Sequence, residues 1–223
     1  MNILDEAISK GQSTLSEYQS KKFLASYGIP ITKEQLVNTK EEAVRAAKEI
    51  GFPVVLKGCS PEITHKTELN LIELDLRDDT SVADSYEKII SQKEASIEGV
   101  LVQEMVKGQR ELVIGLTRDP QFGPCVMYGL GGIFTEILND VSFRIAPLEK
   151  RDAMEMVREI KGHKIIDAFR GKPPVDIDVL CNALIALGNI GLEFNQVKEI
   201  DINPLIINGD KPIAVDALVV LNV

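Results

Sequence analysis

Helix-type and strand-type spacings of apolar residues alternate along this chain. Residues 39–51, TKEEAVRAAKEIG, predict a helix, because Thr39 and Glu42 can form a capping box and Gly51 can close the helix in a left-handed conformation. The apolar run FPVVLK, residues 52–57, predicts a short buried strand. Further helices are expected in residues 13–28, 80–93, 149–162 and 173–191, and further strands in 29–37, 70–76, 98–106, 110–119, 123–132 and 197–221. This alternation predicts an α/β or α+β fold built in layers.

Residues 173–191 and 197–221 indicate a core helix and a strand hairpin in the C-terminal half of the chain. In residues 173–191 the apolar residues fall on one helical face, which is typical of a core helix, and they are Ile177, Leu180, Leu184 and Leu187. The C-terminal segment predicts strands joined by a turn at Asn208-Gly209-Asp210. We expect two lobes, residues 1–98 and 99–223, the first with a histidine loop and the second with the C-terminal strands.

Composition and charge exclude several classes of protein. The 223 residues carry a net charge of −9, which disfavours nucleic acid as a partner. No apolar run approaches the roughly 18 residues of a membrane span, and the N-terminus lacks the pattern of a secretory signal. The three cysteines, Cys59, Cys125 and Cys181, are scattered, which favours a reducing cytoplasm over a disulfide framework or a zinc site.

Three polar positions at strand ends are candidates for nucleotide contacts. Lys57 ends an apolar strand, so it is either a lysine at a strand end or a point charge for phosphoryl oxygens. The segment Glu104-Met105-Val106 ends another, and it is either ordinary strand or a source of backbone groups for an adenine edge. Glu111 is either a solvated strand residue or a contact to ribose or metal.

Two further features suit anions and cations respectively. Gly129–Gly132, GLGG, is either a tight turn or a nest of backbone N–H groups for an anion. Asn203 and Asp216 occupy matching places on strands joined by the predicted hairpin, so they should lie close together. One amide and one carboxylate oxygen meet the needs of Mg²⁺, which completes its octahedron with phosphates and water. The alternative is a turn asparagine and an edge-strand aspartate.

His65 lies in a loop that follows the strand ending at Lys57. A lone loop histidine is usually a surface residue, but a neutral imidazole can also attack phosphorus and form phosphohistidine. The loop of residues 58–69 has about six residues to a side, which allows its tip an excursion of roughly 20 Å. Such a tip could carry a phosphoryl group between two sites.

The motifs together resemble a known family. The succession SPEITHKTE, VQEMVKGQREL, RDPQFGPCVMYGLGGIFTEIL, FRGKPP and EIDINPL is similar to the ATP-grasp subunit of ADP-forming acyl-CoA synthetases, over residues 15–221. The resemblance implies an ATP-grasp fold with the nucleotide between two lobes. It also implies the reaction acetyl-CoA + ADP + phosphate to acetate + ATP + CoA, with a separate CoA-binding α subunit, in an assembly with two copies of each chain.

The resemblance also implies roles for individual residues. His65 would shuttle the phosphoryl group, Lys57 would contact the nucleotide phosphates, and Glu104, Met105 and Val106 would face adenine. In the C-terminal half, Glu111 would contact the nucleotide, and Asn203 with Asp216 would bind Mg²⁺ beside ATP or ADP. His163 matches no catalytic histidine of the family and is expected at the surface.

One departure from the family pattern affects the phosphate loop. The family usually has two glycines where this chain has Asn70 and Leu71, and leucine adopts left-handed backbone poorly. Either the loop takes another conformation or nucleotide binding is weakened. Two other functions therefore stay open: a nucleotide-binding regulatory subunit without chemistry, and an ATP-grasp ligase that forms an acyl phosphate directly.

Overall fold

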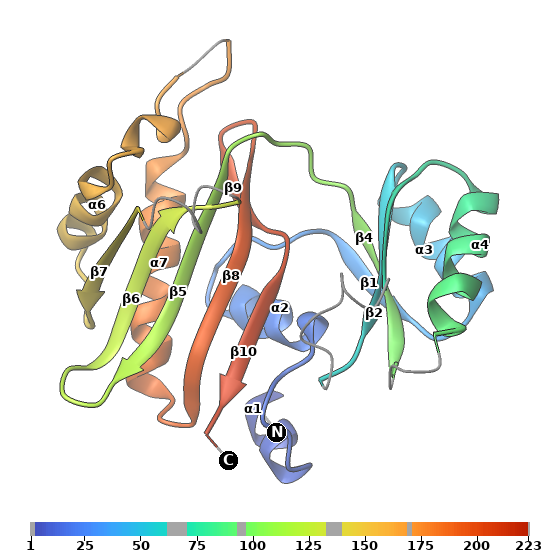
Figure 1. The fold of residues 1–223 in the computed structure, drawn as a ribbon, viewed down its shortest axis with the longest axis horizontal. Coiled ribbons are helices and arrows are strands. Elements are labelled where there is room, and N and C mark those ends of the chain that lie inside the picture. The colour runs from blue at the N-terminus through green and yellow to red at the C-terminus, as the bar shows by residue number, and fades with distance from the viewer. Residues whose placement is uncertain (1–2, 62–70, 93–96, 133–139, 169–170, 223) are drawn as a thin grey trace. The chain divides into compact units, whose positions relative to one another are not determined.

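The chain forms two compact units in a computed structural model, which describes residues 3–61, 71–92, 97–132, 140–168 and 171–222. The small unit comprises Leu15–Gln19 and Thr32–Val106; the large unit comprises Met1–Thr14, Ser20–Ile31 and Lys107–Val223. Each contains an antiparallel sheet with two helices packed on it (Figure 1). The mixed α/β architecture predicted from the apolar spacing is confirmed.

The small unit is a four-stranded sheet in the order β1-β4-β2-β3. Its elements are β1 (Glu34–Val37), α3 (Lys40–Ile50), β2 (Val54–Cys59), β3 (Ile72–Leu76), α4 (Asp79–Ile90) and β4 (Gly99–Glu104). Alternate residues of β2 and β4, Val54 and Leu56 with Val100 and Val102, form a core with the alanines of α3 and the apolar face of α4. The other face of β2 carries Lys57.

The predicted cap of α3 is present in a modified form. Thr39 accepts a hydrogen bond from the N–H of Glu42, as a capping box requires. The Glu42 carboxylate, however, accepts from the N–H of Asn38 at 2.9 Å. At the other end Gly51 has a positive φ of 97° but a ψ of 131°, so it does not take the predicted left-handed helical conformation. Its N–H donates to the carbonyl of Ala47.

The large unit is a six-stranded sheet in the order β10-β8-β5-β6-β7, with β9 paired to β8. Its strands are β5 (Glu111–Asp119), β6 (Gly123–Leu130), β7 (Val141–Ile145), β8 (Val197–Asn208), β9 (Lys211–Ala214) and β10 (Ala217–Leu221). Its helices are α1 (Ile3–Ser9), most of α2 (Glu17–Ser26), α6 (Lys150–Glu159) and α7 (Ile177–Glu193), with a 3-10 turn η1 (His163–Ile166). The helices α6 and α7 pack on one face of the sheet (Figure 1).

The boundary between the units differs from the predicted division at residue 98. Strand β4 hydrogen bonds to both β1 and β2, so the small unit continues to Val106. Two N-terminal stretches belong to the large unit instead. The carbonyl of Ser13 accepts from the N–H of Leu221, and Ser20 Oγ accepts from the N–H of Val219. Each unit is therefore built from segments that are not contiguous in the sequence.

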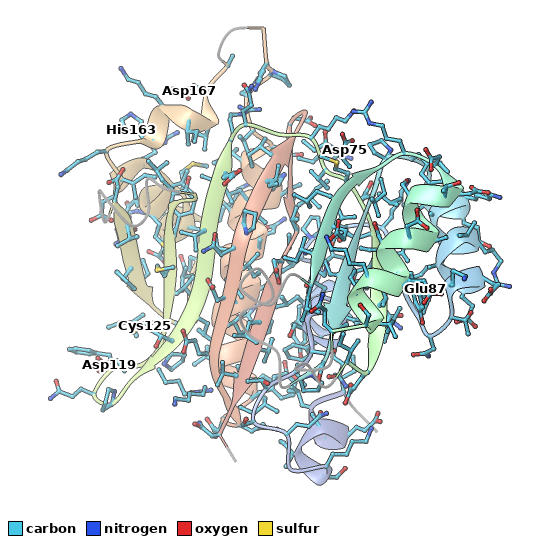
Figure 2. All side chains as sticks on the ribbon, turned by 45° about the vertical axis from the view of Figure 1, so that its right-hand side comes forward. Asp75, Glu87, Asp119, Cys125, His163 and Asp167 are labelled. Carbon is cyan, nitrogen blue, oxygen red and sulfur yellow. The ribbon has the colours of Figure 1, made fainter. Side chains whose placement is uncertain are left out.

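Two expectations from composition can be compared with the structure. All three cysteines are free thiols; Cys59 and Cys181 are buried, and Cys125 is half-buried on β6 (Figure 2). Among the described residues, no helix combines the length and apolar character that a membrane crossing requires.

Candidate functional site

Asn203 and Asp216 are neighbours in the large unit. Strand β8 pairs with β9 beyond Asn203 and with β10 before it, and the chain bends at Val215-Asp216 where it passes from one to the other. At this bend the N–H of Asn203 donates to the carbonyl of Asp216 at 3.2 Å. The turn around Gly209, predicted from Asn208-Gly209-Asp210, sets this register. The predicted proximity of Asn203 and Asp216 is confirmed by this backbone contact.

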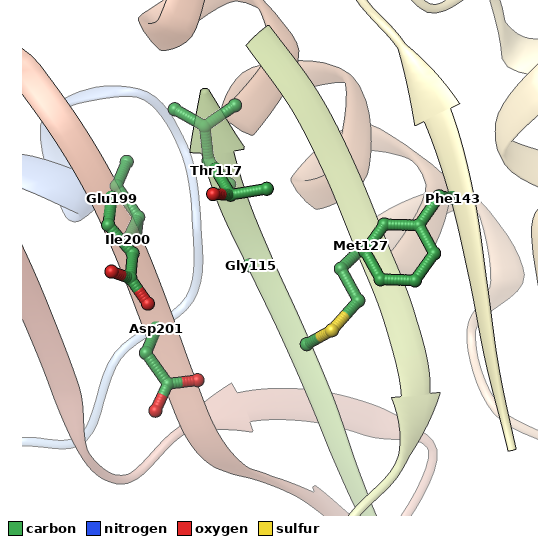
Figure 3. Close-up of a pocket in the computed structure, with 8 residues that line it drawn as sticks. Gly115, Thr117, Met127, Phe143, Glu199, Ile200 and Asp201 are labelled. Atoms are coloured by element: carbon green, nitrogen blue, oxygen red, sulfur yellow. The ribbon is translucent and has the colours of Figure 1, made fainter. Parts of the chain in front are cut away.

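A second carboxylate lies beside this pair. Ile200 and Ile202 are buried toward the core, so alternation places Glu199, Asp201 and Asn203 on the opposite face of β8. Figure 3 shows Glu199 and Asp201 next to Gly115 of β5 and Met127 of β6. We call this the acidic face; it carries Glu199, Asp201, Asn203 and Asp216.

The acidic face has a shallow pocket. Gly115 lies between Asp201 and Met127 across the sheet and has no side chain to fill the space. A methyl group there would lie 2.7 Å from the carbonyl oxygen of Ile200. The pocket is lined by Gly115, Leu116, Thr117, Met127, Phe143, Glu199, Ile200 and Asp201.

The electrostatics of the acidic face favour a cation. Burial, followed by the charges of Glu199 and Asp216, raises the pKa of Asp201 from 3.8 to about 6. A divalent cation would relieve this repulsion. Among the described residues, no group of three or more acidic, cysteine or histidine side chains is placed to hold a metal ion. Asn203 and Asp216 offer an amide and a carboxylate oxygen, which are hard donors of the kind that Mg²⁺ takes. The donor types of Asn203 and Asp216 thus fit the predicted metal.

Glu111 is held against two glycines. The N–H of Gly131 donates to the Glu111 carbonyl at 2.8 Å, and a methyl group at Gly132 would lie 2.9 Å from Glu111 Oε2. Gly132 has a φ of 66°, which favours glycine. The N–H of Gly131 is therefore engaged by the backbone, and GLGG acts here as a close-packed strand end and turn. The absence of side chains allows the Glu111 carboxylate to lie against this turn.

Lys21 supports the bend that carries Asp216. It is fully buried on α2, and its Nζ donates to the carbonyl of Val215 at 3.3 Å. The apolar periodicity of this helix does not reveal which of its faces is covered, so the sequence alone gives no sign of a role for Lys21.

In the small unit, Lys57 forms a buried ion pair. In the sheet, Lys57 of β2 lies opposite Leu101 of β4 and Ile72 of β3. Its Nζ atom lies 2.7 Å from Glu17 Oε1. The side chains of Lys57 and Glu17 are 6% and 1% exposed. Lys57 is therefore no solvated strand-end lysine, and its ammonium is held at a fixed place by a carboxylate.

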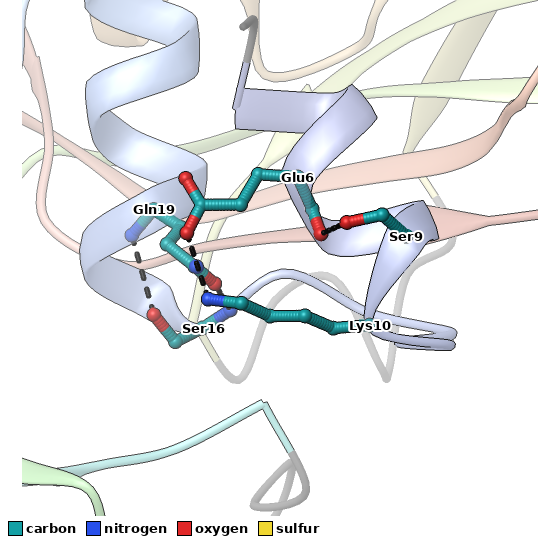
Figure 4. Close-up of polar contacts among 5 residues, drawn as sticks. All are labelled: Glu6, Ser9, Lys10, Ser16 and Gln19. Carbon is teal, nitrogen blue, oxygen red and sulfur yellow. Dashed lines mark hydrogen bonds and ion pairs between the residues drawn. The ribbon is translucent and has the colours of Figure 1, made fainter.

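A capping box positions Glu17. Ser16 Oγ accepts from the N–H of Gln19 at 3.3 Å, and Gln19 Oε1 accepts from the N–H of Ser16 at 3.0 Å (Figure 4). The box starts α2 at Glu17, where the helix dipole favours a carboxylate. Figure 4 also shows the exposed Lys10–Glu6 pair of α1, at 2.7 Å. The signature Ser16-x-x-Gln19 would have marked this helix start, but it could not reveal the partner of Glu17.

In the segment Glu104-Met105-Val106, two of the three backbone N–H groups donate to protein carbonyls. The N–H groups of Glu104 and Met105 donate to the carbonyls of Lys33 and Pro53, and Glu104 Oε1 accepts from the N–H of Lys33 at 2.7 Å. Within the described residues the N–H of Val106 donates to no acceptor. An adenine edge needs one such donor.

Leu71, at a position where the resemblance led us to expect a glycine, belongs to the core of the small unit. It is fully buried, and its carbonyl accepts from the N–H of Gly58 at 2.8 Å. Among the described residues only Asp75 combines a side chain with positive φ, so Leu71 needs no left-handed backbone. His65 and Asn70 belong to residues 62–70 and lie outside the described residues.

Comparison with known proteins identifies the family. Residues 6–221 match the model of an ATP-grasp domain. The chain is 43% identical over 212 residues to the β subunit of acetate–CoA ligase [ADP-forming] I of Pyrococcus furiosus, covering 93% of this chain and 91% of that protein.

Two solved structures of the dinucleotide-forming acetyl-coenzyme A synthetase 1 of Ca. Korarchaeum cryptofilum are also similar. Each is 44% identical and covers 99% of this chain and 98% of that one. One contains coenzyme A, acetyl-coenzyme A and a phosphorylated phosphohistidine segment in the site I orientation, with a TM-score of 0.89. The other contains coenzyme A and Mg-AMPPCP with the phosphohistidine segment pointing towards the nucleotide binding site, with a TM-score of 0.88. This chain therefore belongs to the ATP-grasp family, among the β subunits of the ADP-forming acetate–CoA ligases.

Proposed function

We propose that this chain is the nucleotide-binding subunit of an ADP-forming acyl-CoA synthetase, and that it makes ATP by transferring a phosphoryl group from His65 to ADP. The reaction is acetyl-CoA + ADP + phosphate to acetate + ATP + CoA. The observation that carries this proposal is the pairing of Asn203 with Asp216 beside Asp201, in a chain whose relatives hold a phosphohistidine segment.

The transfer step is a displacement at phosphorus. The N–P bond of phosphohistidine breaks, and its electron pair returns to the imidazole nitrogen. An oxygen of the ADP β-phosphate forms the new O–P bond. A proton on the other ring nitrogen lets the imidazole leave as a neutral group. The two orientations of the segment in the Korarchaeum structures support a His65 segment that moves between two sites.

The described residues supply the binding groups. In the small unit, the N–H of Val106 donates to adenine, Glu104 and Met105 form the strand end beside it, and the Lys57 ammonium contacts phosphate oxygens. In the large unit, Glu111 contacts the nucleotide, and Asn203 and Asp216 hold Mg²⁺ with ADP or ATP. When bound, Mg²⁺ neutralises charge on the phosphates.

The partner in this proposal is a CoA-binding α subunit, in an α2β2 assembly. Because the relative is named a β subunit, the chain acts with another polypeptide. The three free thiols are compatible with a reducing compartment, and we place the enzyme in the cytoplasm.

The histidines provide the test and its control. The chain has two histidines, and the Nδ1 atom of the second, His163, lies 3.1 Å from the carbonyl oxygen of Ile160. In the complex reconstituted with its α subunit, His65→Gln should abolish ATP synthesis from acetyl-CoA, ADP and phosphate, whereas His163→Gln should retain it.

A labelling experiment separates the proposal from the non-catalytic alternatives. With ³²P-phosphate and acetyl-CoA, the wild-type chain should acquire acid-labile, base-stable label, and His65→Gln should not. ADP binding without label on this chain would identify a regulatory subunit. Carboxylate-dependent ATP hydrolysis by the isolated chain would identify direct acyl phosphate formation.

A further inference from the structure

A second cavity in the large unit is rimmed by cations. It is lined by Gln109, Arg110, Lys164, Ile165 and Lys172. The first two residues precede β5, and Lys164 and Ile165 belong to η1, the turn that Figure 2 marks by His163 and Asp167. None of the five lines the pocket on the acidic face.

Arg110 is the fixed cation of this cavity. It is 7% exposed, and its guanidinium donates to the carbonyls of Gly209 at 2.7 Å and of Ile165 and Asp167 at 3.4 Å. A guanidinium has five N–H donors, and these three bonds leave two of them. One of the two, the buried Nε–H, has no acceptor among the described residues. Backbone carbonyls thus hold the group in place without neutralising it.

Among the described residues, the two lysines of the cavity also have no acidic partner. Lys172 Nζ donates to Gln109 Oε1 at 2.8 Å, which is a neutral amide oxygen. Lys164 is exposed. In the part of the chain that the structure describes, Arg110, Lys164 and Lys172 form no ion pair.

This arrangement is unusual in so acidic a chain. Acidic residues number 34 against 25 lysines and arginines. Several other lysines are paired with carboxylates: Lys10, Lys40, Lys48, Lys57, Lys88 and Lys150. Asp167, the acid nearest in sequence to Lys164, lines the neighbouring cavity with His163. Three cations that form no ion pair within the described residues surround one cavity, and they create a local positive potential that favours an anion.

We propose that this cavity binds a phosphate group, supplied either by orthophosphate or by a phosphate ester. The planar guanidinium of Arg110 matches two oxygens of a tetrahedral anion, and the two ammonium groups act as point charges beside it. The Gln109 amide adds a neutral donor, and Ile165 closes the cavity with an apolar wall. This site is separate from the predicted nucleotide contacts and does not depend on the proposed function.

Phosphate titration of the full chain tests the proposal. Calorimetry is performed without Mg²⁺, on the wild type and on the double variant Lys164→Gln/Lys172→Gln. Removal of two charges should weaken orthophosphate binding roughly tenfold, about 1.4 kcal/mol. Lys161→Gln is the matched control, because Lys161 is exposed, lies three residues before Lys164 and does not line the cavity. It should bind phosphate as the wild type does.

Further variants and ligands define the site. Arg110→Lys keeps the charge but removes the planar fork, so it should also weaken phosphate binding, with the fold checked by circular dichroism. A parallel titration with glycerol 2-phosphate distinguishes the sources: tighter binding of the ester indicates a phosphorylated metabolite, and tighter binding of orthophosphate indicates the free anion.

Two results would overturn the proposal. One is equal phosphate affinity in the wild type, the double variant and Lys161→Gln, which would place the anion elsewhere. The other is no phosphate binding to the wild type at millimolar concentration. If Lys172→Glu then also prevented association with the α subunit, the cations would instead serve an acidic surface of that partner.

Discussion

The Lys57 ammonium lies 2.7 Å from the Glu17 carboxylate, in a buried pair inside the small unit. Charges removed from water in this way are stable only with close partners. The pair places a positive charge at a defined point on β2. A predicted phosphate contact therefore has a structural role as well, and experiments must separate the two.

Substitution of Lys57 should affect stability and nucleotide binding independently. Lys57→Met removes the ammonium from a buried carboxylate, so we expect a loss of about 3–5 kcal/mol in the free energy of unfolding. The double variant Lys57→Met/Glu17→Leu replaces both charges by apolar groups and should recover most of this loss. Urea unfolding measures both.

ADP calorimetry on the same double variant tests the contact to phosphate. If Lys57 binds the nucleotide, affinity stays low although stability has recovered. A double variant that binds ADP as tightly as the wild type would restrict Lys57 to a structural role.

Asp201 should make stability depend on pH. Its pKa is raised from 3.8 to about 6, so the folded chain binds this proton more tightly than the unfolded chain. Below about pH 4 the carboxyl is protonated in both states and does not lower the free energy of unfolding. As the pH rises its ionisation lowers the free energy of unfolding, and this effect is complete above about pH 6. Two pKa units correspond to about 3 kcal/mol, which solvent screening reduces to roughly 1–2 kcal/mol.

The neutral variant Asp201→Asn tests whether the ionised Asp201 carboxylate destabilises the fold. Asp201→Asn should unfold at higher urea than the wild type near pH 8, and the difference should vanish near pH 4. Glu199→Gln, which removes one of the repelling charges, should give a smaller gain of the same sign. Added Mg²⁺ should stabilise the wild type more than Asp201→Asn. A variant less stable than the wild type at pH 8 would contradict the repulsion argument.

Local patterns predicted much of this fold. The cap at Thr39, the apolar face of α7 and the hairpin at Gly209 depend on residues within a few positions of one another, and all three are present. The hairpin also placed Asn203 beside Asp216, because its register follows from the turn. For the same reason, these two residues are the part of the candidate site that the sequence indicated most directly.

Non-local relations could not be predicted in this way. Glu17 is 40 residues from Lys57, and no spacing rule connects a helix start to a distant strand. Strand β7 was missed, because it buries Ser142 and exposes Phe143 and Ile145, the reverse of the usual alternation. The unit boundary differs because β4 pairs with strands on both sides, which depends on topology rather than on linker composition.

Two glycines of α7 should respond in opposite ways to a methyl group. A Cβ at Gly191 would lie 2.7 Å from Pro124 Cβ and 2.9 Å from Leu116 Cδ1. The nearest atom to a Cβ at Gly188 is Leu148 Cδ1, at 3.3 Å, the end of a flexible side chain. Gly191→Ala should therefore destabilise the fold by roughly 1–3 kcal/mol through overpacking.

Gly188→Ala is the matched control. Alanine is favoured over glycine inside a helix by about 0.5–1 kcal/mol, so this variant should be neutral or slightly more stable. Denaturant unfolding of both variants compares them directly. Equal losses in the two would show that α7 does not pack against β5 and β6 as closely as these distances require.

The pair Asn203 and Asp216 should determine the Mg²⁺ dependence of nucleotide binding. Because Mg²⁺ takes few protein ligands, loss of either oxygen should raise the Mg²⁺ concentration needed for ADP binding by at least about tenfold, or about 1.4 kcal/mol. Asn203→Ala and Asp216→Asn test each ligand. Asn208→Ala is the matched control, since Asn208 is an exposed amide at the far end of the same strand. Calorimetric titrations of ADP at several Mg²⁺ concentrations give the comparison. If all three variants share the wild-type Mg²⁺ dependence, the metal ligands lie elsewhere, and the close approach of the two residues serves only the turn between β9 and β10.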